Sequence, residues 1–314
     1  MQWVENMEYI TGRTDFKLHN SVVSLGKFDG IHLGHQLLLN KILEQKSKGY
    51  QAVMFTFMFH PNNLFSDKEI DTIYTEEEKR YLLEQSGLDV LVSYPFTEET
   101  ASMEPEDFIK DVLINKLDAR MIVVGSDFRF GHKRRGNVAL LQSMSGTYGY
   151  ELVVFDKMKL EDQVISSTYI RNELLEGHIE KANSMLGRPF SIIGEVQHGR
   201  KIGRTLGFPT TNLIPAEHKL LPPNGVYASI TIINGKKYPG VTNIGFNPTV
   251  GITPEPRVET YIIDFDSDLY GTTIEVCLYS LERREVKFHS LDELKAQMQK
   301  DITFGREYYA KVSY

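Results

Sequence analysis

The pattern of hydrophobic and polar positions changes once along the chain, near residue 186. From Ser21 to about Asp156, short runs of β-branched and aromatic residues alternate with segments of helical pattern. Strands that are apolar on both faces are typical of a buried parallel sheet, and strand–helix alternation is typical of a doubly wound α/β domain. We expect strands at Val22–Gly26, Ala52–Phe57, Val90–Pro95, Met121–Gly125 and Glu151–Phe155, with helices at Gln36–Lys48, Glu76–Gln85, Glu106–Leu117 and Val138–Ser145.

The second part of the chain consists of short strand-like runs separated by Gly, Pro and Asn. The dipeptide Asn234-Gly235 predicts a hairpin with a type I′ turn. This spacing of short strands favours an antiparallel barrel or sandwich. The expected strands are Ile230–Ile233, Lys236–Val241, Val258–Phe265 and Thr273–Tyr279, and a final helix begins with the capping box Ser290–Glu293 and reaches about Tyr309.

Length and charge support two domains with separate tasks. The chain has 314 residues, of which 41% are hydrophobic and 25% charged, so a disordered or fibrous protein is excluded. Residues 1–183 hold 20 basic and 28 acidic residues, whereas residues 184–314 hold 15 and 14. The total charge of −7 argues against a nucleic-acid binder held by bulk electrostatics. We therefore expect domains at 1–183 and 184–314 and no nucleic-acid partner.

The cellular setting is indicated by one cysteine and by the apolar runs. Cys277 is a single cysteine and forms no internal disulfide, which fits a reducing compartment. The N-terminus lacks the basic flank and apolar run of a signal peptide, and no apolar run approaches the ~18 residues of a membrane span. The sequence predicts a cytoplasmic protein without a membrane partner, either a monomer or a weak homo-oligomer.

A glycine- and histidine-containing segment, Ser24–His35, follows the first expected strand. Ligands of α/β domains bind beyond the strand ends, and the N–H groups of a helix N-terminus suit phosphate. Gly26, Gly30 and Gly34 let the backbone approach a polyphosphate closely. His32 and His35 can donate to oxygens that gain charge at a reacting phosphorus. The alternative is that both histidines only begin a helix in a turn.

Two further loops of the first domain fall at the same expected sheet edge. The segment Gly125–Gly136 is basic, and the segment Ile165–Arg171 is rich in hydroxyl groups. Each has a plain alternative: the first is then a solvated surface loop, and the second only caps a helix. Three phosphate-compatible loops at one edge favour a nucleotide site. The polar residues concerned are Arg129, Lys133, Arg134, Arg135, Ser166, Ser167, Thr168 and Arg171.

A third glycine-rich, basic segment, Gly194–Asn212, lies in the second domain. Thr210 and Asn212 point the same way if this stretch is extended, and their hard oxygen atoms suit Mg²⁺ bound to ATP phosphates. The alternative is a turn, since Pro-Thr-Thr-Asn is rich in turn-forming residues. The glycines and cations that suit phosphate covering are Gly199, Gly203, Gly207, Arg200, Lys201 and Arg204.

Together these motifs resemble the bacterial bifunctional riboflavin kinase/FMN adenylyltransferase (FAD synthetase) family. The resemblance spans about Val22 to Tyr309. It implies a doubly wound parallel-sheet nucleotidyltransferase domain followed by an antiparallel Greek-key-type β-barrel with a C-terminal helix. The matching segments are Gly26–His35, Tyr94–Phe96, Met103–Glu106, Gly125–Gly131, Ile165–Arg171, Gly207–Asn212, Leu221–Tyr227, Asn243–Thr249 and Arg257–Gly271.

For the first domain, the resemblance implies that His32 and His35 contact ATP phosphates during adenylyl transfer. The expected ATP-binding residues are Gly26, Phe28, Asp29, Gly30, His32, His35, Asp127, Arg129, Ser166, Ser167, Thr168 and Arg171, and the expected flavin-binding residues are His60, Pro61, Asp127 and Phe128. One position departs from the family pattern, because Phe59 stands where a proline is usual before His60-Pro61.

For the second domain, the resemblance implies that Glu259 is the general base of a kinase. Thr211 replaces the alanine of the family signature Gly-Phe-Pro-Thr-Ala-Asn, and its hydroxyl is expected on the opposite side from Thr210. The expected ATP-binding residues are Gly199, Lys201, Gly203, Thr210 and Asn212, of which Thr210 and Asn212 hold Mg²⁺.

The resulting hypothesis is a bifunctional transferase that converts riboflavin to FMN and FMN to FAD. ATP is the co-substrate of both steps, Mg²⁺ is required, and no tightly held organic cofactor is expected. One alternative is a chain that retains one of the two activities. A second is a flavin- or nucleotide-binding regulator without turnover. A tRNA-charging synthetase with an H-x-G-H motif is disfavoured by the acidic first half and by the lack of an RNA-binding extension.

Overall fold

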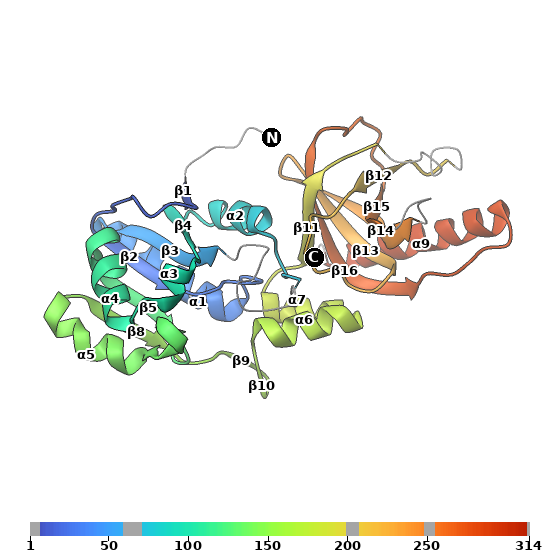
Figure 1. The fold of residues 1–314 in the computed structure, drawn as a ribbon. Helices are drawn as coiled ribbons and strands as arrows, with labels where there is room; N and C mark the ends of the chain where they lie inside the picture. The colour runs from blue at the N-terminus through green and yellow to red at the C-terminus, as the bar shows by residue number, and fades with distance from the viewer. Residues whose placement is uncertain (1–6, 59–70, 199–206, 248–254, 313–314) are drawn as a thin grey trace. The chain divides into compact units, whose positions relative to one another are not determined.

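The computed structural model describes residues 7–58, 71–198, 207–247 and 255–312. The chain forms two compact units, one up to Ser166 and one from Ser167 onward (Figure 1). Among the described residues, no helix has the length and apolar character needed to cross a membrane.

A parallel sheet of six strands forms the centre of the first unit, in the order β1-β4-β3-β2-β5-β8. Its strands are β1 (Glu8–Thr11), β2 (Ser21–Leu25), β3 (Gln51–Met58), β4 (Val90–Pro95), β5 (Ala119–Gly125) and β8 (Glu151–Phe155). Two small hairpins lie outside it: β6 (Arg129–Phe130) with β7 (Gly136–Asn137), and β9 (Lys159–Leu160) with β10 (Gln163–Val164). The doubly wound parallel sheet predicted from the sequence is confirmed.

The four helices predicted for the first unit are present close to their expected bounds, whereas the short helix Glu98–Ser102 was not predicted. They are α1 (Leu33–Glu44) with a 3₁₀ turn at Gln45–Lys48, α2 (Glu76–Glu84), α3 (Glu98–Ser102), α4 (Pro105–Asp107) continued by a π-helix over Phe108–Lys116, a 3₁₀ turn at His132–Arg134, and α5 (Val138–Tyr148). The predicted helix Glu106–Leu117 is thus mostly of π type. At the start of α2, Thr75 Oγ1 accepts from the N–H of Glu78 at 3.2 Å and the Glu78 carboxylate accepts from the N–H of Thr75 at 3.0 Å.

Burial on both faces explains why the predicted strands were apolar throughout. All five residues of β2 are buried. Val23 and Val53 belong to one hydrophobic cluster with Phe108 of the π-helix. Their neighbours Val22 and Met54, which point to the other face, are equally inaccessible. The edge strand β1 was not predicted, because only one of its four residues is buried.

A six-stranded antiparallel sheet in the order β11-β16-β13-β14-β15-β12 forms the second unit. The strands β16-β13-β14-β15 have the fourth-first-second-third order of a Greek key. A bridge between Gln197 and Asn212 connects the two edges, and the N–H of Gln197 donates to the carbonyl of Asn212 at 2.9 Å. The predicted Greek-key barrel is therefore confirmed. Its strands are β11 (Phe190–Glu195), β12 (Thr210–Leu213), β13 (Gly225–Ile233), β14 (Lys236–Asn247), β15 (Glu255–Ile262) and β16 (Thr273–Arg284).

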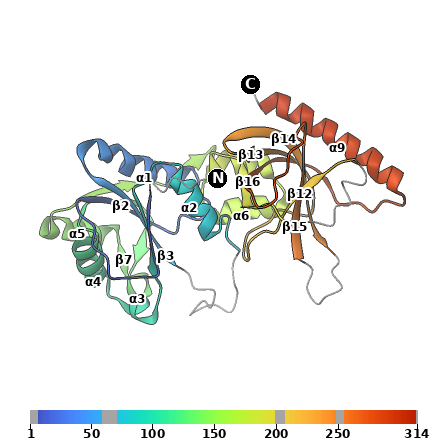
Figure 2. The same cartoon turned by 90° about the horizontal axis from the view of Figure 1, so that it is seen from above.

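Among the described residues of the second unit there are three helices: α6 (Ser167–Glu176), α7 (Ile179–Leu186) and α9 (Leu291–Val312). Figures 1 and 2 show α9 lying along β13 and β14, where Ile302 packs with Val226 and Val241. The buried Asp301 carboxylate also accepts two hydrogen bonds from Arg283, at 2.7 and 3.0 Å. These contacts fix α9 on one face of the sheet.

The turn between β13 and β14 is the predicted type I′ hairpin. Asn234 and Gly235 both have positive φ, at 50° and 78°. The strands β11 and β12 were not predicted. For β12 the reason is that it has only four residues and a composition typical of turns.

Candidate functional site

The segment between β2 and α1 forms a tight loop with an unusual backbone. Phe28, Gly30 and Ile31 have positive φ values of 52°, 83° and 43°. Phe28 is fully buried, and its ring lies beside Gly26, where an added Cβ would be only 3.0 Å from the ring carbons. Two left-handed non-glycine residues in one loop represent stored strain, which is common at ligand-binding sites. The buried ring of Phe28 therefore holds the loop in one conformation.

His32 and His35 are brought together at the start of α1. Their rings stack with centroids 3.7 Å apart and planes at 16°. His32 is the N-cap, and its Nδ1 accepts from the backbone N–H of His35 at 3.3 Å. This bond leaves the proton of the neutral ring on Nε2. His32 thus serves as a helix cap, as the plain alternative had it, while its outer nitrogen stays available as a donor.

Burial makes both histidines neutral at physiological pH. Loss of hydration lowers the pKa of His32 to about 4. Burial, together with the charges of His32 and Lys79, holds the pKa of His35 well below its usual value. Within the described part of the chain, the buried Nδ1 of His35 has no hydrogen-bond partner. A neutral imidazole offers only an N–H dipole to an anion, so any cation that a polyphosphate needs must come from other residues.

We expect the stability of the first unit to fall at mildly acidic pH. The pKa of His32 is about 4 in the fold and near its ordinary value of 6.5 when unfolded. The unfolded state then binds more protons between these values. Stability from neutral His32 is present in full above about pH 6.5 and is lost as the pH falls towards 4, by about 3 kcal/mol. Denaturant unfolding at pH 7 and pH 4.5 measures this loss, and His32→Ser, which keeps an N-cap oxygen, should show a smaller one.

Asp29, an expected ATP-binding residue, has a structural contact in this loop. Its Oδ1 accepts from the backbone N–H of Ile73 at 2.9 Å, just before α2. This hydrogen bond connects the loop between β2 and α1 to the residues just before α2. This pairing was not predictable from the sequence, because the two residues belong to different elements.

The second loop is built around Glu104. Its carboxylate pairs with Nδ1 of His132 at 3.2 Å and with the guanidinium of Arg135. The backbone N–H of His132 donates to the carbonyl of Met103 at 2.8 Å, and Gly131 leaves no room for a Cβ against Pro105. The Met103–Glu106 motif thus supports the basic loop, and Arg135 is already paired.

The remaining expected residues of the second loop are more accessible. Arg129, Lys133 and Arg134 are exposed. The Asp127 carboxylate is exposed and pairs with Lys157 at 2.8 Å, and the Phe128 ring stacks on Phe130 with centroids 5.5 Å apart. This loop therefore presents cations, one carboxylate and an aromatic ring after β5.

The third loop contributes residues to both compact units. Ser166 ends the first unit, whereas Ser167, Thr168 and Arg171 lie in α6 of the second. Their approach to the histidines stays a prediction. His60 and Pro61, the expected flavin-binding residues, lie outside the described residues, as does Phe59.

The kinase-type residues of the second unit meet across the sheet. Asn212 of β12 is directly opposite Glu259 of β15, and Thr210, two residues earlier, shares their face. Asn212 is 5% exposed, and its Oδ1 has no hydrogen-bond partner among the described residues. Thr211 points the other way and donates to the carbonyl of Thr260 at 3.2 Å. The expected residues Gly199, Lys201 and Gly203 lie outside the described residues.

Comparison with known proteins assigns the chain to a family. The FAD synthetase model matches residues 15–169, and the riboflavin kinase model matches residues 186–309. The bifunctional riboflavin kinase/FMN adenylyltransferase of Buchnera aphidicola subsp. Schizaphis graminum is 40% identical over 299 residues, covering 92% of this chain and 94% of the relative. The proteins of the same name from Escherichia coli K12 and Bacillus subtilis 168 are 39% and 38% identical, covering 92% and 93% of each chain. This chain belongs to the bifunctional riboflavin kinase/FMN adenylyltransferase family.

A solved structure extends the likeness to the whole fold. It is the crystal structure of a protein from Streptococcus pneumoniae named as a macrolide-efflux protein, with a TM-score of 0.83 and 31% identity. The match covers 96% of this chain and 99% of the other. The two units therefore follow one another along the chain in the same order as in the Streptococcus pneumoniae protein.

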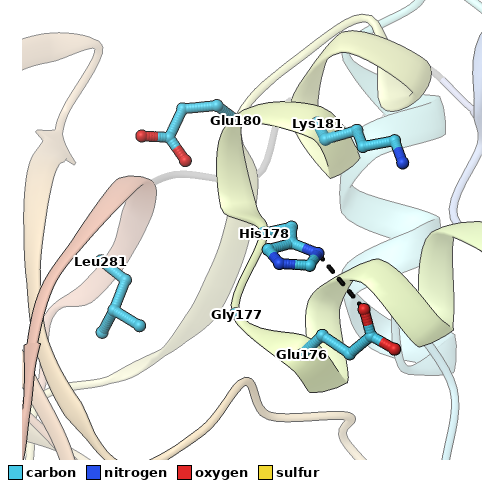
Figure 3. A pocket seen from close by; sticks show the side chains of 6 residues that line it. All are labelled: Glu176, Gly177, His178, Glu180, Lys181 and Leu281. Atoms are coloured by element: carbon cyan, nitrogen blue, oxygen red, sulfur yellow. Dashed lines mark ion pairs between the residues drawn. The ribbon is translucent and has the colours of Figure 1, made fainter.

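The two family models leave residues 170–185 unmatched, which contain most of α6 and α7. A pocket at this corner is lined by Glu176, Gly177, His178, Glu180, Lys181 and Leu281 (Figure 3). Its charged groups are largely paired with one another and with the buried Glu173, which binds Lys181 and His178 at 2.8 Å each. None of the predicted site residues of this bifunctional family lines the pocket.

Proposed function

We propose that this chain phosphorylates riboflavin to FMN in the second unit and adenylylates FMN to FAD in the first. One observation carries the proposal: both family models occur in order, the first over residues 15–169, almost entirely on the first compact unit, and the second over residues 186–309, on the second. We assign the adenylyltransferase to residues 1–183 and the kinase to residues 184–314. Riboflavin, FMN, FAD and ATP are the proposed small-molecule partners.

For the kinase step, the residues facing Glu259 support a phosphoryl transfer to a hydroxyl group. The riboflavin 5′-hydroxyl attacks the γ-phosphorus of ATP, its new O–P bond replaces the bond to ADP, and its proton passes to the Glu259 carboxylate. Positioning and charge stabilisation account for most of such a rate enhancement. Glu259 is the proposed general base because it stands beside Asn212 on the same face.

The residues next to Glu259 also fit Mg²⁺. Asn212 offers a buried amide oxygen without a partner among the described residues, and Thr210 offers a hydroxyl from the same face. Hard oxygen donors are the ligands that Mg²⁺ prefers. When bound, Mg²⁺ neutralises charge on the ATP phosphates. Thr210 and Asn212 are the proposed ligands.

For the adenylyltransferase step, neutral histidines support transfer through hydrogen bonding. An oxygen of the FMN phosphate attacks the α-phosphorus of ATP, and pyrophosphate leaves as the bond to the β-phosphate breaks. The Nε2–H of His32 would donate to the α-phosphate oxygens, which gain charge during the attack. His35 is proposed to act beside it, with the backbone N–H groups of the loop and of the α1 N-terminus.

The remaining assignments of the first unit follow the family pattern. Gly26, Phe28, Asp29, Gly30, Asp127, Arg129, Ser166, Ser167, Thr168 and Arg171 are proposed for ATP, and His60, Pro61, Asp127 and Phe128 for the flavin. We further propose a cytoplasmic monomer or weak oligomer, in keeping with the single free cysteine Cys277, which is buried.

A time course separates this proposal from its alternatives. The purified protein is incubated with riboflavin, ATP and Mg²⁺, and FMN and FAD are resolved by chromatography. We expect FMN to appear first and FAD after it, with both absent when EDTA replaces Mg²⁺. FMN without FAD would show that only the kinase is retained, and no product would favour a regulator.

A further inference from the structure

The polar face that contains Asn212 and Glu259 continues onto the next strand of the barrel, β14. Asn243 of β14 is directly opposite Glu259, on the side away from Asn212. Asn212, Glu259 and Asn243 therefore form a row of polar residues across three neighbouring strands. Val226 of β13 is opposite Asn243, so the row ends at the apolar residues packed against α9.

A second polar row runs beside the first and contains Glu285. Arg284, the last residue of β16, is opposite Gly225, the first residue of β13. Glu285 and Asn224 are therefore the next residues beyond the paired ends of these two strands. The amide nitrogen of Asn224 donates to Glu285 Oε2 at 3.4 Å. The Glu285 carboxylate then reaches over β14, where it occupies the space that a side chain at Gly245 would need.

Gly245 joins the two rows. A Cβ at this position would overlap Glu285 Oε1 and would lie 3.5 Å from the amide nitrogen of Asn243. The absence of a side chain at Gly245 thus lets Glu285 approach Asn243, which is next to Glu259. The result is a track of hydrogen-bonding groups from Asn212 through Glu259 and Asn243 to Glu285.

We infer that Asn243 and Glu285 bind the polyol chain of the flavin substrate and so determine its recognition by the kinase site. The inference rests on the proposed function, in which Glu259 receives the proton of the terminal hydroxyl. Asn243 and Glu285 lead away from Glu259 on the side opposite Asn212 and Thr210, which are assigned to the ATP phosphates. The hydroxyl groups that precede the reacting one therefore have partners along the track.

The charges on the track favour a neutral, hydroxyl-rich ligand. A carboxylate only accepts hydrogen bonds and an amide both donates and accepts, so together they match hydroxyl groups on successive carbons. The carboxylate of Glu285 would repel a phosphate placed at the end of the track away from Asn212. Glu285 is exposed and its carboxylate is accessible to a ligand. A polyol is the part of riboflavin that fits.

The test compares riboflavin with lumiflavin, which has the same ring system with a methyl group in place of the polyol. Binding of each is followed by flavin fluorescence, and FMN formation is measured separately. We expect Glu285→Gln, which keeps an acceptor oxygen but removes the charge, to weaken riboflavin binding and raise its KM about tenfold, because a charge-assisted hydrogen bond becomes a neutral one. The kcat should stay within about twofold and lumiflavin binding should not change.

Two further variants complete the experiment. Asn243→Ala should also weaken riboflavin binding and leave lumiflavin binding unchanged. Glu307→Gln removes an exposed carboxylate from α9 and should change neither. Equal loss of both flavins would show a structural role and overturn the inference, as would unchanged riboflavin binding in both variants. If the wild type makes no FMN, the proposed function fails, while the ratio of riboflavin to lumiflavin affinity still decides this inference.

Discussion

Replacing Glu259 by Ala should lower FMN formation from riboflavin by about 10²–10⁴-fold, the usual contribution of a general base. Conversion of FMN to FAD should stay within about twofold, since the first unit has its own core and contains His32 and His35, which are proposed for that step. Both rates are measured on the same preparation by chromatography, with riboflavin or FMN as the starting flavin. The two substrates thus report the two units independently.

Two variants make the Glu259 result specific. Glu259→Gln keeps the size of the side chain but accepts no proton, so it should lose as much kinase activity as the alanine variant. Glu307→Ala removes an exposed carboxylate of the same unit and should leave both rates unchanged. Kinase activity above a tenth of the wild type in Glu259→Gln would contradict the role of general base. Loss of both activities in Glu259→Ala would contradict separate sites.

Replacing His32 by Ala should have the opposite pattern, with FAD formation from FMN lowered by about 10²–10³-fold. This is the usual effect of removing one donor to an oxygen that gains charge in the reaction. Phosphorylation of riboflavin should stay within about twofold. Because His32 also caps α1, the alanine variant should be about 1 kcal/mol less stable as well.

His32→Ser separates the cap from the chemistry. A serine oxygen can accept the N–H of His35 and restore the N-cap, but it is too short to replace Nε2 as a donor. We expect this variant to recover stability in denaturant unfolding and to remain as inactive as His32→Ala. Recovery of FAD formation together with stability would show that His32 only caps the helix.

The first unit was largely predictable because its signals are local. Strands that are apolar on both faces alternate with helical segments, and this pattern located β2, β3, β4, β5 and β8 within two residues of their observed bounds at most ends. The capping residue Thr75 marked the start of α2 correctly. The half-exposed edge strand β1 lacks that apolar pattern and was missed for this reason.

The second unit was predictable in class but less so in detail. The dipeptide Asn234-Gly235 has a strong intrinsic preference for its turn, so the hairpin followed from two residues. The strand β12 has no such signal, since its Thr-Thr-Asn sequence is equally typical of a turn. It is extended because β15 provides its hydrogen-bond partners, and Gln197 completes the closure of the barrel.

The sequence by itself determined the two domains, their fold classes and the identity of the loops that resemble nucleotide sites. Only the tertiary structure decided which residues face each other: Asn212 and Asn243 flank Glu259, Asp29 holds the entry to α2, and Glu104 pairs with Arg135. It also decided that the two histidines are neutral, because their pKa values depend on burial. Hydrophobic periodicity is a property of neighbouring residues, whereas strand register and burial arise from contacts between distant segments.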